Sequence, residues 1–344
     1  MPRPYGRDND GFTGAHSRGD AARRTLGPGM PGPPRLASRN MRAMSVVRPR
    51  ASLIYNPNAG RRRHGQTIER IKAALETAYE LSITPTGGPR EAIRLARDAA
   101  TRGDAAVFAW GGDGTIREVV EGILGSPVIL GVLPGGTFNV VALAVGVGRD
   151  PVRAAIALAT AKPGARDVGL INSTPFLMQA TAGLEGYAMH HVRAEMKARF
   201  GMAGAVIDVL RAFTRYRFPS FMVEVDGVSH EVTGALFVNI AEYGGRVHIV
   251  PGARWDDGRA HVLLYTGTTH LGALAFAVNM LLGRHQNRRD VTILEAAQLT
   301  IRHDPALHIQ VDGDAWDGSL PATCRLAPDR IQVLIPERVR PTGR

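Results

Sequence analysis

Apolar residues follow two different patterns, one on each side of about residue 166. From residue 51 to about 165, short apolar runs alternate with segments of helical periodicity. The predicted strands are 51–55, 81–84, 105–110 and 128–133, and the predicted helices are 66–79 and 89–102, the second with Pro89 in its first turn. Strands that alternate with helices predict a parallel sheet covered by helices.

Beyond residue 166, short strand-like runs dominate, and turn pairs such as Asp226–Gly227 separate them. The predicted strands are 176–180, 221–225, 235–240, 260–265, 299–302, 307–311 and 331–335. Two predicted helices, 190–213 and 271–283, interrupt this series. The pattern indicates a mainly antiparallel β-sandwich.

These patterns predict an α/β protein with two lobes. The first lobe is a parallel-sheet α/β lobe over 48–165, and the second is a β-sandwich lobe over 166–325. Residues 1–47 mix Gly, Pro and Arg without periodicity, so we expect a disordered leader, with a start at Met41 or Met44 as the alternative. Residues 326–344 form a C-terminal strand and tail that can return to the first lobe.

Composition narrows the class of protein. The net charge is +11, but residues 1–50 hold ten arginines against three aspartates, so the total does not indicate a nucleic-acid partner. The single cysteine, Cys324, can form neither an internal disulfide nor a thiolate metal site, which favours a reducing cytoplasm and no disulfide-linked partner. The apolar stretch 271–282 is shorter than the roughly 20 residues of a bilayer-spanning helix. We interpret it as buried packing and expect a soluble protein.

Two glycine-rich turns are the strongest chemical signal. Gly111–Thr115 lies between a buried strand and an amphipathic helix, where glycines let the backbone approach a phosphate and helix N-terminal amides attract anions. Asp113 could hold Mg²⁺ or orient a phosphate there, although an ordinary capped turn has the same pattern. The second turn, 133–139, follows the next strand, so both turns should border one crevice. The P-loop pattern Gly-x-x-x-x-Gly-Lys-Ser/Thr is absent from the sequence.

Several further motifs follow these turns in a fixed order. The ordered motifs are 56–60, 111–115, 134–139, 239–245, 251–253 with 256–258, 283–285 and 311–314. Over about residues 50–336 the sequence resembles the catalytic domain shared by diacylglycerol kinases, sphingosine and ceramide kinases, and bacterial lipid kinases. Its first lobe also resembles that of NAD kinases.

This resemblance implies an ATP-dependent lipid kinase, most simply one that converts diacylglycerol to phosphatidic acid. A sphingoid-base or ceramide kinase, an NAD kinase, and a lipid-binding regulatory protein with weakened catalysis are the alternatives. NAD kinases carry an Asn-Glu pair followed by a second glycine-rich loop. This sequence lacks that arrangement, which argues against the NAD kinase alternative. The expected partner is a lipid at a membrane surface, in transient contact with a cytoplasmic, peripheral protein. A homodimer is compatible with the sequence.

The resemblance also implies roles for individual residues. The implied nucleotide contacts are Asn56, Thr86, Gly111, Gly112, Asp113, Gly114, Thr115, Glu118, Gly136, Thr137 and Asn139, with Thr84 competing with Thr86. Asp314 matches the base that receives the lipid hydroxyl proton, while Asp312–Gly313 could equally be a hairpin turn with solvated carboxylates. The Asp257 side chain and the carbonyls of Arg254 and Arg259 match a structural Mg²⁺ site, with a simple turn as the alternative.

Four positions depart from the family pattern. Arg117 stands where the family usually has Asn, Val140 where it has Asp, and Asp314 where it has Glu. Tyr187 stands where many members have Asp. The shorter carboxylate of Asp314 could be retracted by about 1.5 Å. Because a misplacement of about 1 Å can cost roughly 100-fold in rate, weak activity or an unusual substrate is compatible with the sequence.

Overall fold

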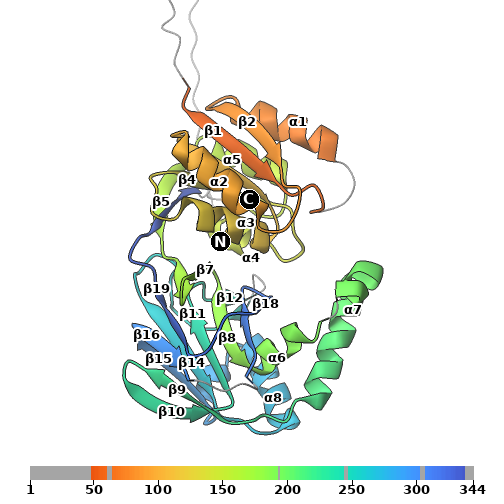
Figure 1. Cartoon of the computed structure of the whole chain (residues 1–344), viewed down its shortest axis with the longest axis vertical. Helices are drawn as coiled ribbons and strands as arrows, with labels where there is room; N and C mark the ends of the chain where they lie inside the picture. Colours follow the sequence, from red (N-terminus) through yellow and green to blue (C-terminus); the bar gives the residue numbers. More distant parts are fainter. Residues whose placement is uncertain (1–47, 60–63, 193, 244–246, 303–306, 338–344) are drawn as a thin grey trace, which may run out of the picture. The chain divides into compact units, whose positions relative to one another are not determined.

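A computed structural model describes residues 48–59, 64–192, 194–243, 247–302 and 307–337. Figure 1 shows the chain with its helices and strands labelled. The described residues from 48 onward belong to one compact unit. The predictions for the leader 1–47 and for the tail beyond residue 337 lie outside the described residues.

The first sheet has the strand order β2-β1-β3-β4-β20-β5. Its strands are β1 (Arg50–Tyr55), β2 (Glu80–Pro85), β3 (Ala106–Gly111), β4 (Ile129–Pro134), β5 (Lys162–Arg166) and β20 (Ile331–Ile335). The first four and β20 are parallel, whereas β5 is antiparallel to β20. The predicted parallel sheet is therefore confirmed. Strand β20 brings the buried side chains of Val333 and Leu334 to this sheet from the far end of the chain.

Five helices accompany this sheet in the described part of the chain: α1 (His64–Leu75), α2 (Glu91–Thr101), α3 (Asp113–Ile123), α4 (Val140–Val145) and α5 (Pro151–Leu158). Helices α2 and α3 pack closely (Figure 1), since a Cβ on Gly122 would lie 2.5 Å from the Ile93 carbonyl oxygen. The prediction that Pro89 opens a helix is wrong. Helix α2 begins at Glu91, because Arg90 has a left-handed backbone (φ 64°) and its amide donates to Glu118.

Residues 169–326 form two six-stranded sheets, with the orders β10-β9-β16-β19-β6-β7 and β15-β14-β11-β8-β17-β18. The strands of the first are β6 (Gly169–Ile171), β7 (Thr174–Phe176), β9 (Phe221–Val225), β10 (Val228–Val232), β16 (Gln298–Ile301) and β19 (Ala322–Leu326). Those of the second are β8 (Gln179–Gly183), β11 (Gly234–Val238), β14 (Ala260–Tyr265), β15 (Val291–Ala296), β17 (Ile309–Val311) and β18 (Asp314–Trp316). The strand pairings within these two sheets are antiparallel, as predicted, and a common core joins Phe176 to Phe237.

Two details of this region differ from the prediction. The predicted strand 176–180 is interrupted, because the amides of Leu177 and Met178 donate to a buried carboxylate instead of a neighbouring strand. The predicted helix 190–213 corresponds to α7 (Ala194–Arg215), and a separate short helix before it, α6 (Leu184–His190), was not predicted. The short strands β12 (Glu242–Tyr243) and β13 (Val247–His248) and the 3₁₀ turn His285–Asn287 complete the elements.

Helix α8 (His270–Leu281) forms where predicted, but its predicted burial is wrong. Ala273 is its one buried residue, whereas Leu271 is 79% exposed and Leu281 73% exposed. Ala273 packs against Tyr216 and Phe218, and Phe276 packs against Tyr265 with the ring centroids 4.9 Å apart. Among the described residues, no helix is both long and apolar enough to cross a bilayer.

Candidate active site

The two glycine-rich turns lie in direct backbone contact. Strands β3 and β4 are neighbours, so the turns that follow them start side by side, with Gly111 opposite Pro134. The Gly135 amide donates to the Gly111 carbonyl oxygen at 2.8 Å. A Cβ on Gly136 would lie only 2.6 Å from the Cα of Gly112. Glycine is required at this crossing because any side chain would push the turns apart.

Asp113 joins the second turn to the first. It is the first residue of α3, and its carboxylate oxygens accept the amides of Val140 and Val141 at 3.2 and 3.0 Å. These amides open α4 and have no partner within that helix. Asn139 closes the same turn, because its side chain accepts from the Gly136 amide and donates to the Gly136 carbonyl. Its backbone is left-handed, with φ 53°.

The loops after β1 and β2 end beside these turns. The Asn56 amide donates to the Trp110 carbonyl at 3.0 Å, and the Asn56 side chain accepts the amide of Asn58. The Thr86 amide donates to Tyr55, and Thr86 is buried. Thr84, its competitor, lies within β2 opposite Ile54.

Three other predicted nucleotide contacts have structural partners. Thr115 lies against Gly111, where an added Cβ would be 2.6 Å from its side chain. The Thr137 carbonyl accepts from Arg149 at 3.3 Å. The Glu118 carboxylate accepts the Arg90 amide at 2.9 Å and so holds the start of α2.

Asp314 lies beside the first glycine turn although 197 residues separate it from its partner there. Its carboxylate oxygen Oδ2 is 3.1 Å from Arg117 Nη2 and 3.7 Å from the position a Cβ would take on Gly114. The side chain of Asp314 is 59% exposed and that of Arg117 is 19% exposed. The structure therefore places an accessible carboxylate over the glycine turn.

The neighbouring Asp312 has a role that the sequence did not indicate. Asp312 and Gly313 both have positive φ and form a two-residue hairpin turn, as one alternative predicted. Its carboxylate, however, is buried rather than solvated, and it accepts the amides of Leu177, Met178 and Gln179 at 2.8, 2.8 and 3.1 Å. Burial raises the pKa of Asp312 to about 6, although these amides and Arg117 favour the charged form.

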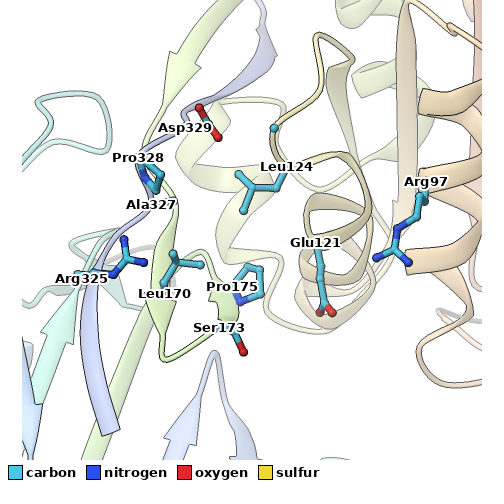
Figure 2. A pocket seen from close by; sticks show the side chains of 11 residues that line it. Arg97, Glu121, Leu124, Leu170, Ser173, Pro175, Arg325, Ala327, Pro328 and Asp329 are labelled. Carbon is cyan, nitrogen blue, oxygen red and sulfur yellow. The ribbon is translucent and has the colours of Figure 1, made fainter.

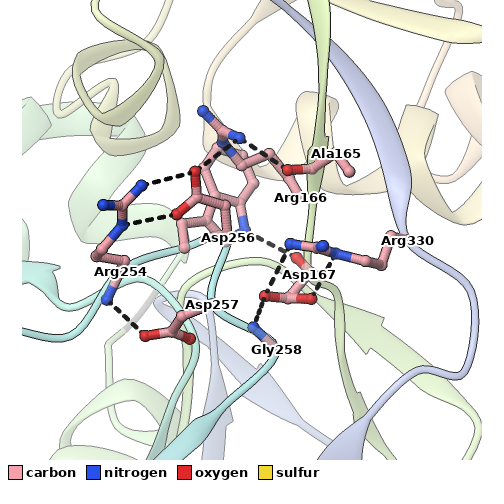
Figure 3. A network of polar contacts seen from close by, with 9 residues as sticks. Ala165, Arg166, Asp167, Arg254, Asp256, Asp257, Gly258 and Arg330 are labelled. Carbon is pink, nitrogen blue, oxygen red and sulfur yellow. Dashed lines mark hydrogen bonds and ion pairs between the residues drawn. The ribbon is translucent and has the colours of Figure 1, made fainter.

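The predicted Mg²⁺ site around Asp257 has the geometry of a turn. Its carboxylate accepts the backbone amide of Arg254 at 3.2 Å (Figure 3) and that of Arg259 at 3.0 Å. Mg²⁺ requires a nearly octahedral set of oxygen ligands, and the described residues contain no group of three or more His, Cys, Asp or Glu side chains placed for a metal. The Mg²⁺ site stays a prediction, and the turn alternative accounts for these contacts.

A second polar network in the same region was missed from the sequence. Asp167 forms an ion pair with Arg330 at 2.9 Å and accepts the Gly258 amide at 2.9 Å (Figure 3). Its carbonyl accepts from Trp255 Nε1 at 2.7 Å and from Asn239 Nδ2 at 3.0 Å. This network connects the start of the antiparallel region to the segment that leads into β20. Its partners are distant in sequence, so no local pattern could have revealed it.

The hollow shown in Figure 2 is separate from the glycine turns. It has a volume of about 510 Å³, and Glu121 and Leu124, at the C-terminal end of α3, lie on one of its sides. Arg325 and Asp329 lie opposite them. The glycine turn lies at the N-terminal end of α3, whose eleven residues span roughly 16 Å, so the hollow and the turn are at opposite ends of the helix. None of the predicted site residues lines this hollow.

Comparisons with known proteins match two consecutive regions of the chain. Residues 50–171 match the model of the diacylglycerol kinase catalytic domain, and residues 179–335 match the YegS C-terminal NAD kinase beta sandwich-like domain. The chain belongs to the diacylglycerol kinase family. A diacylglycerol kinase of Bacillus subtilis strain 168 is 26% identical over 84% of this chain and 97% of its own. A diacylglycerol kinase of Staphylococcus aureus strain MRSA252 is 27% identical over 85% of this chain and 94% of its own.

Solved structures support the fold. The crystal structure of a diacylglycerol kinase from Bacillus anthracis strain Sterne superposes with a TM-score of 0.69 at 22% identity and covers 84% of this chain and 97% of that one. The predicted α/β class and the family are thus confirmed, and the family relatives carry the names of kinases.

Two of the departures from the family pattern, Arg117 and Asp314, contact each other. Arg117 and Asp314 form the ion pair described above. At another departure, Val140, the contact with Asp113 is made by the backbone amide, which every residue except proline supplies. A carboxylate at position 140 is therefore unnecessary for joining the two turns.

Proposed function

We propose that this member of the diacylglycerol kinase family is an ATP-dependent lipid kinase that converts diacylglycerol to phosphatidic acid. The names of its relatives support the substrate class. The observation that carries the proposal is the position of the Asp314 carboxylate against the Gly111–Thr115 turn. A phosphate donor on that turn and a hydroxyl beside the carboxylate would be neighbours.

The turns have the properties that phosphate binding requires. The close contact of Gly112 with Gly136 leaves backbone without side chains facing the site, and the free amides at the start of α3 favour an anion. We therefore assign the ATP phosphates to Gly111–Thr115 and Thr137. The carboxylate of Asp113 is already bonded to Val140 and Val141, so its proposed role is to order the site.

In the proposed reaction, Asp314 accepts the proton of the lipid hydroxyl. The hydroxyl oxygen forms a bond to the γ-phosphorus as the bond from that phosphorus to the ADP oxygen breaks. Magnesium, arriving with ATP, would supply charge neutralisation of the phosphates. Arg117 keeps the Asp314 carboxylate over the turn through its contact at 3.1 Å.

A lipid-binding protein with weakened catalysis is the second candidate. The same ion pair favours it, because the contact with Arg117 occupies an oxygen of the carboxylate that would otherwise receive the substrate proton. Both candidates bind ATP and lipid, so only turnover separates them.

The test is phosphate transfer from labelled ATP to a panel of lipids in mixed micelles. The panel contains diacylglycerol, sphingosine, ceramide and monoacylglycerol, and NAD is included as a soluble acceptor. Asp314→Asn should lower the rate by about 100-fold or more. Asp317→Asn, a change at an exposed carboxylate three residues away, should stay within twofold of the wild type. If ATP binds and no acceptor is phosphorylated, the second candidate holds; transfer that survives Asp314→Asn excludes Asp314 as the base.

A further inference from the structure

Helix α8 is apolar on all sides and yet lies on the surface. Its sequence, His270–Leu281, contains two polar side chains, those of His270 and Asn279. A helix of this composition is normally buried in protein or in a membrane. Here Ala273 alone is buried within it.

The exposed residues form one continuous stripe, which we call the α8 stripe. Its five residues are Leu271 (79% exposed), Leu274 (55%), Val278 (45%), Leu281 (73%) and Leu282 (62%). Their spacing places them within an arc of about 100° on the helix. The buried Ala273 lies on the opposite side, against Tyr216 and Phe218, so the stripe faces away from the protein. Clusters of exposed leucines of this extent mark interaction surfaces.

Helix α7 also exposes apolar side chains, and its end contacts the start of α8. His270, at the start of α8, bonds through Nε2 to the Phe213 carbonyl near the end of α7 at 2.9 Å. The preceding turns of α7 also expose Val206 (48%), Ile207 (42%) and Leu210 (59%). Two connected helices therefore expose apolar side chains.

Positive charge accompanies both helices. In segments 203–219 and 266–290 the only carboxylates are Asp208 and Asp290, and each forms an ion pair with an arginine of its own segment. Four exposed arginines remain that have no acidic partner within these segments: Arg215, Arg217, Arg284 and Arg289. A second copy of the chain would bring like charges together at this surface, whereas an anionic membrane would complement them.

We propose that the α8 stripe, with the exposed apolar residues of α7, docks onto a bilayer surface that contains anionic lipids. The twelve residues of α8 span about 18 Å, less than the roughly 30 Å hydrocarbon core, so the helix would lie in the interface. The proposal rests on the proposed function, since it supplies the contact from which a lipid substrate would enter the site.

The test is co-sedimentation of the full chain with vesicles of phosphatidylcholine and 30% phosphatidylglycerol. The double variant Leu271→Glu with Leu281→Glu should bind about 100-fold more weakly, tenfold for each leucine. Ile156→Glu is the matched control, because Ile156 is 58% exposed on α5. It should bind within twofold of the wild type. Equal binding of the double variant and the wild type would overturn the proposal.

Two further measurements identify the occupant. Arg217→Gln and Arg284→Gln should each weaken binding to the anionic vesicles about fivefold and leave binding to pure phosphatidylcholine unchanged. If the stripe covered a second copy instead, the double variant would change the sedimentation coefficient of the protein without changing vesicle binding, and the proposal would fail.

The vesicle result can be read separately from the kinase result. Turnover of dioctanoylglycerol, which is soluble enough to need no bilayer, should be the same in the double variant and in the wild type. Lost vesicle binding with this turnover retained supports the docking surface. Vesicle binding through the stripe without turnover of any lipid supports the surface and rejects the proposed function.

Discussion

The contact between the two glycine turns gives the sharpest prediction, for Gly136→Ala. The new Cβ would lie 2.6 Å from the Gly112 Cα and 3.3 Å from Asn139 Oδ1. Neither neighbour moves easily, because one is backbone and the other bonds to Gly136 itself. Gly136 does not have a positive φ, so the effect of alanine would be steric alone.

The distances set the expected size of the effect. Ordinary contact begins at 3.4 Å, so the turns must separate by about 0.8 Å to accept the methyl group. A displacement of about 1 Å in a phosphate-binding loop costs roughly 100-fold in rate. Overpacking of this kind also lowers the free energy of unfolding by about 1–3 kcal/mol.

Steady-state phosphate transfer and urea unfolding would measure the two effects. We expect kcat/KM to fall about 100-fold, with a raised KM for ATP, while the protein still folds. Gly65→Ala is the control, because no atom lies within 4 Å of its added Cβ in α1. This variant should keep full activity, and its free energy of unfolding should rise by about 0.5–1 kcal/mol. A Gly136→Ala protein with the KM and kcat of the wild type would refute the assignment of the phosphates to these turns.

Three more predictions concern the carboxylates near the glycine turns and the arginine that contacts one of them. Asp113→Asn replaces one acceptor of the α4 amides by a donor, so the free energy of unfolding measured in urea should fall by about 1–3 kcal/mol. Arg117→Asn should lower kcat about tenfold at unchanged lipid KM, with partial rescue by Arg117→Lys, as positioning of Asp314 requires. The pKa of Asp312 is higher in the folded protein (about 6) than its ordinary 3.8, so protonation of Asp312 stabilises the folded state. This stabilisation is complete below pH 3.8 and is lost as the pH rises through 6. As the pH rises from 5 to 7.5, the free energy of unfolding of the wild type, measured in urea, should therefore fall by about 1.4 kcal/mol relative to that of Asp312→Asn. A difference between the two proteins that does not change with pH would contradict this.

Local periodicity was sufficient to predict most of the first sheet. Strands such as β3 and helices such as α3 follow from patterns within about ten residues, and the positions of the two glycine turns follow from the ends of neighbouring strands. The family resemblance then ordered the remaining motifs. The predicted ends of helices were less accurate where a side chain from another element bonds to the backbone there. Glu118 of α3, for example, accepts the Arg90 amide just before α2 begins.

The interactions missed from the sequence are those whose partners are far apart. The amides that bond to Asp312 lie 133–135 residues before it, and Asp167 and Arg330 are 163 residues apart. Helix α8 shows a different limit of sequence reasoning. A helix of its composition is normally buried in a protein core or in a bilayer, and the sequence does not distinguish the two. The exposed fractions of Leu271 and its neighbours show that the protein core does not cover this side of the helix.

The ion pair between Arg117 and Asp314 changes how the unusual residues of this chain should be interpreted. Taken separately, a shortened carboxylate suggests a damaged base, and an arginine in place of asparagine suggests an altered nucleotide turn. Their contact at 3.1 Å makes them one unit, in which the long guanidinium side chain reaches the short carboxylate beside Gly114. Since asparagine is too short to span the same gap and a glutamate would extend further towards the turn, each residue suits the other. The two substitutions are therefore better explained as a matched pair than as two independent losses.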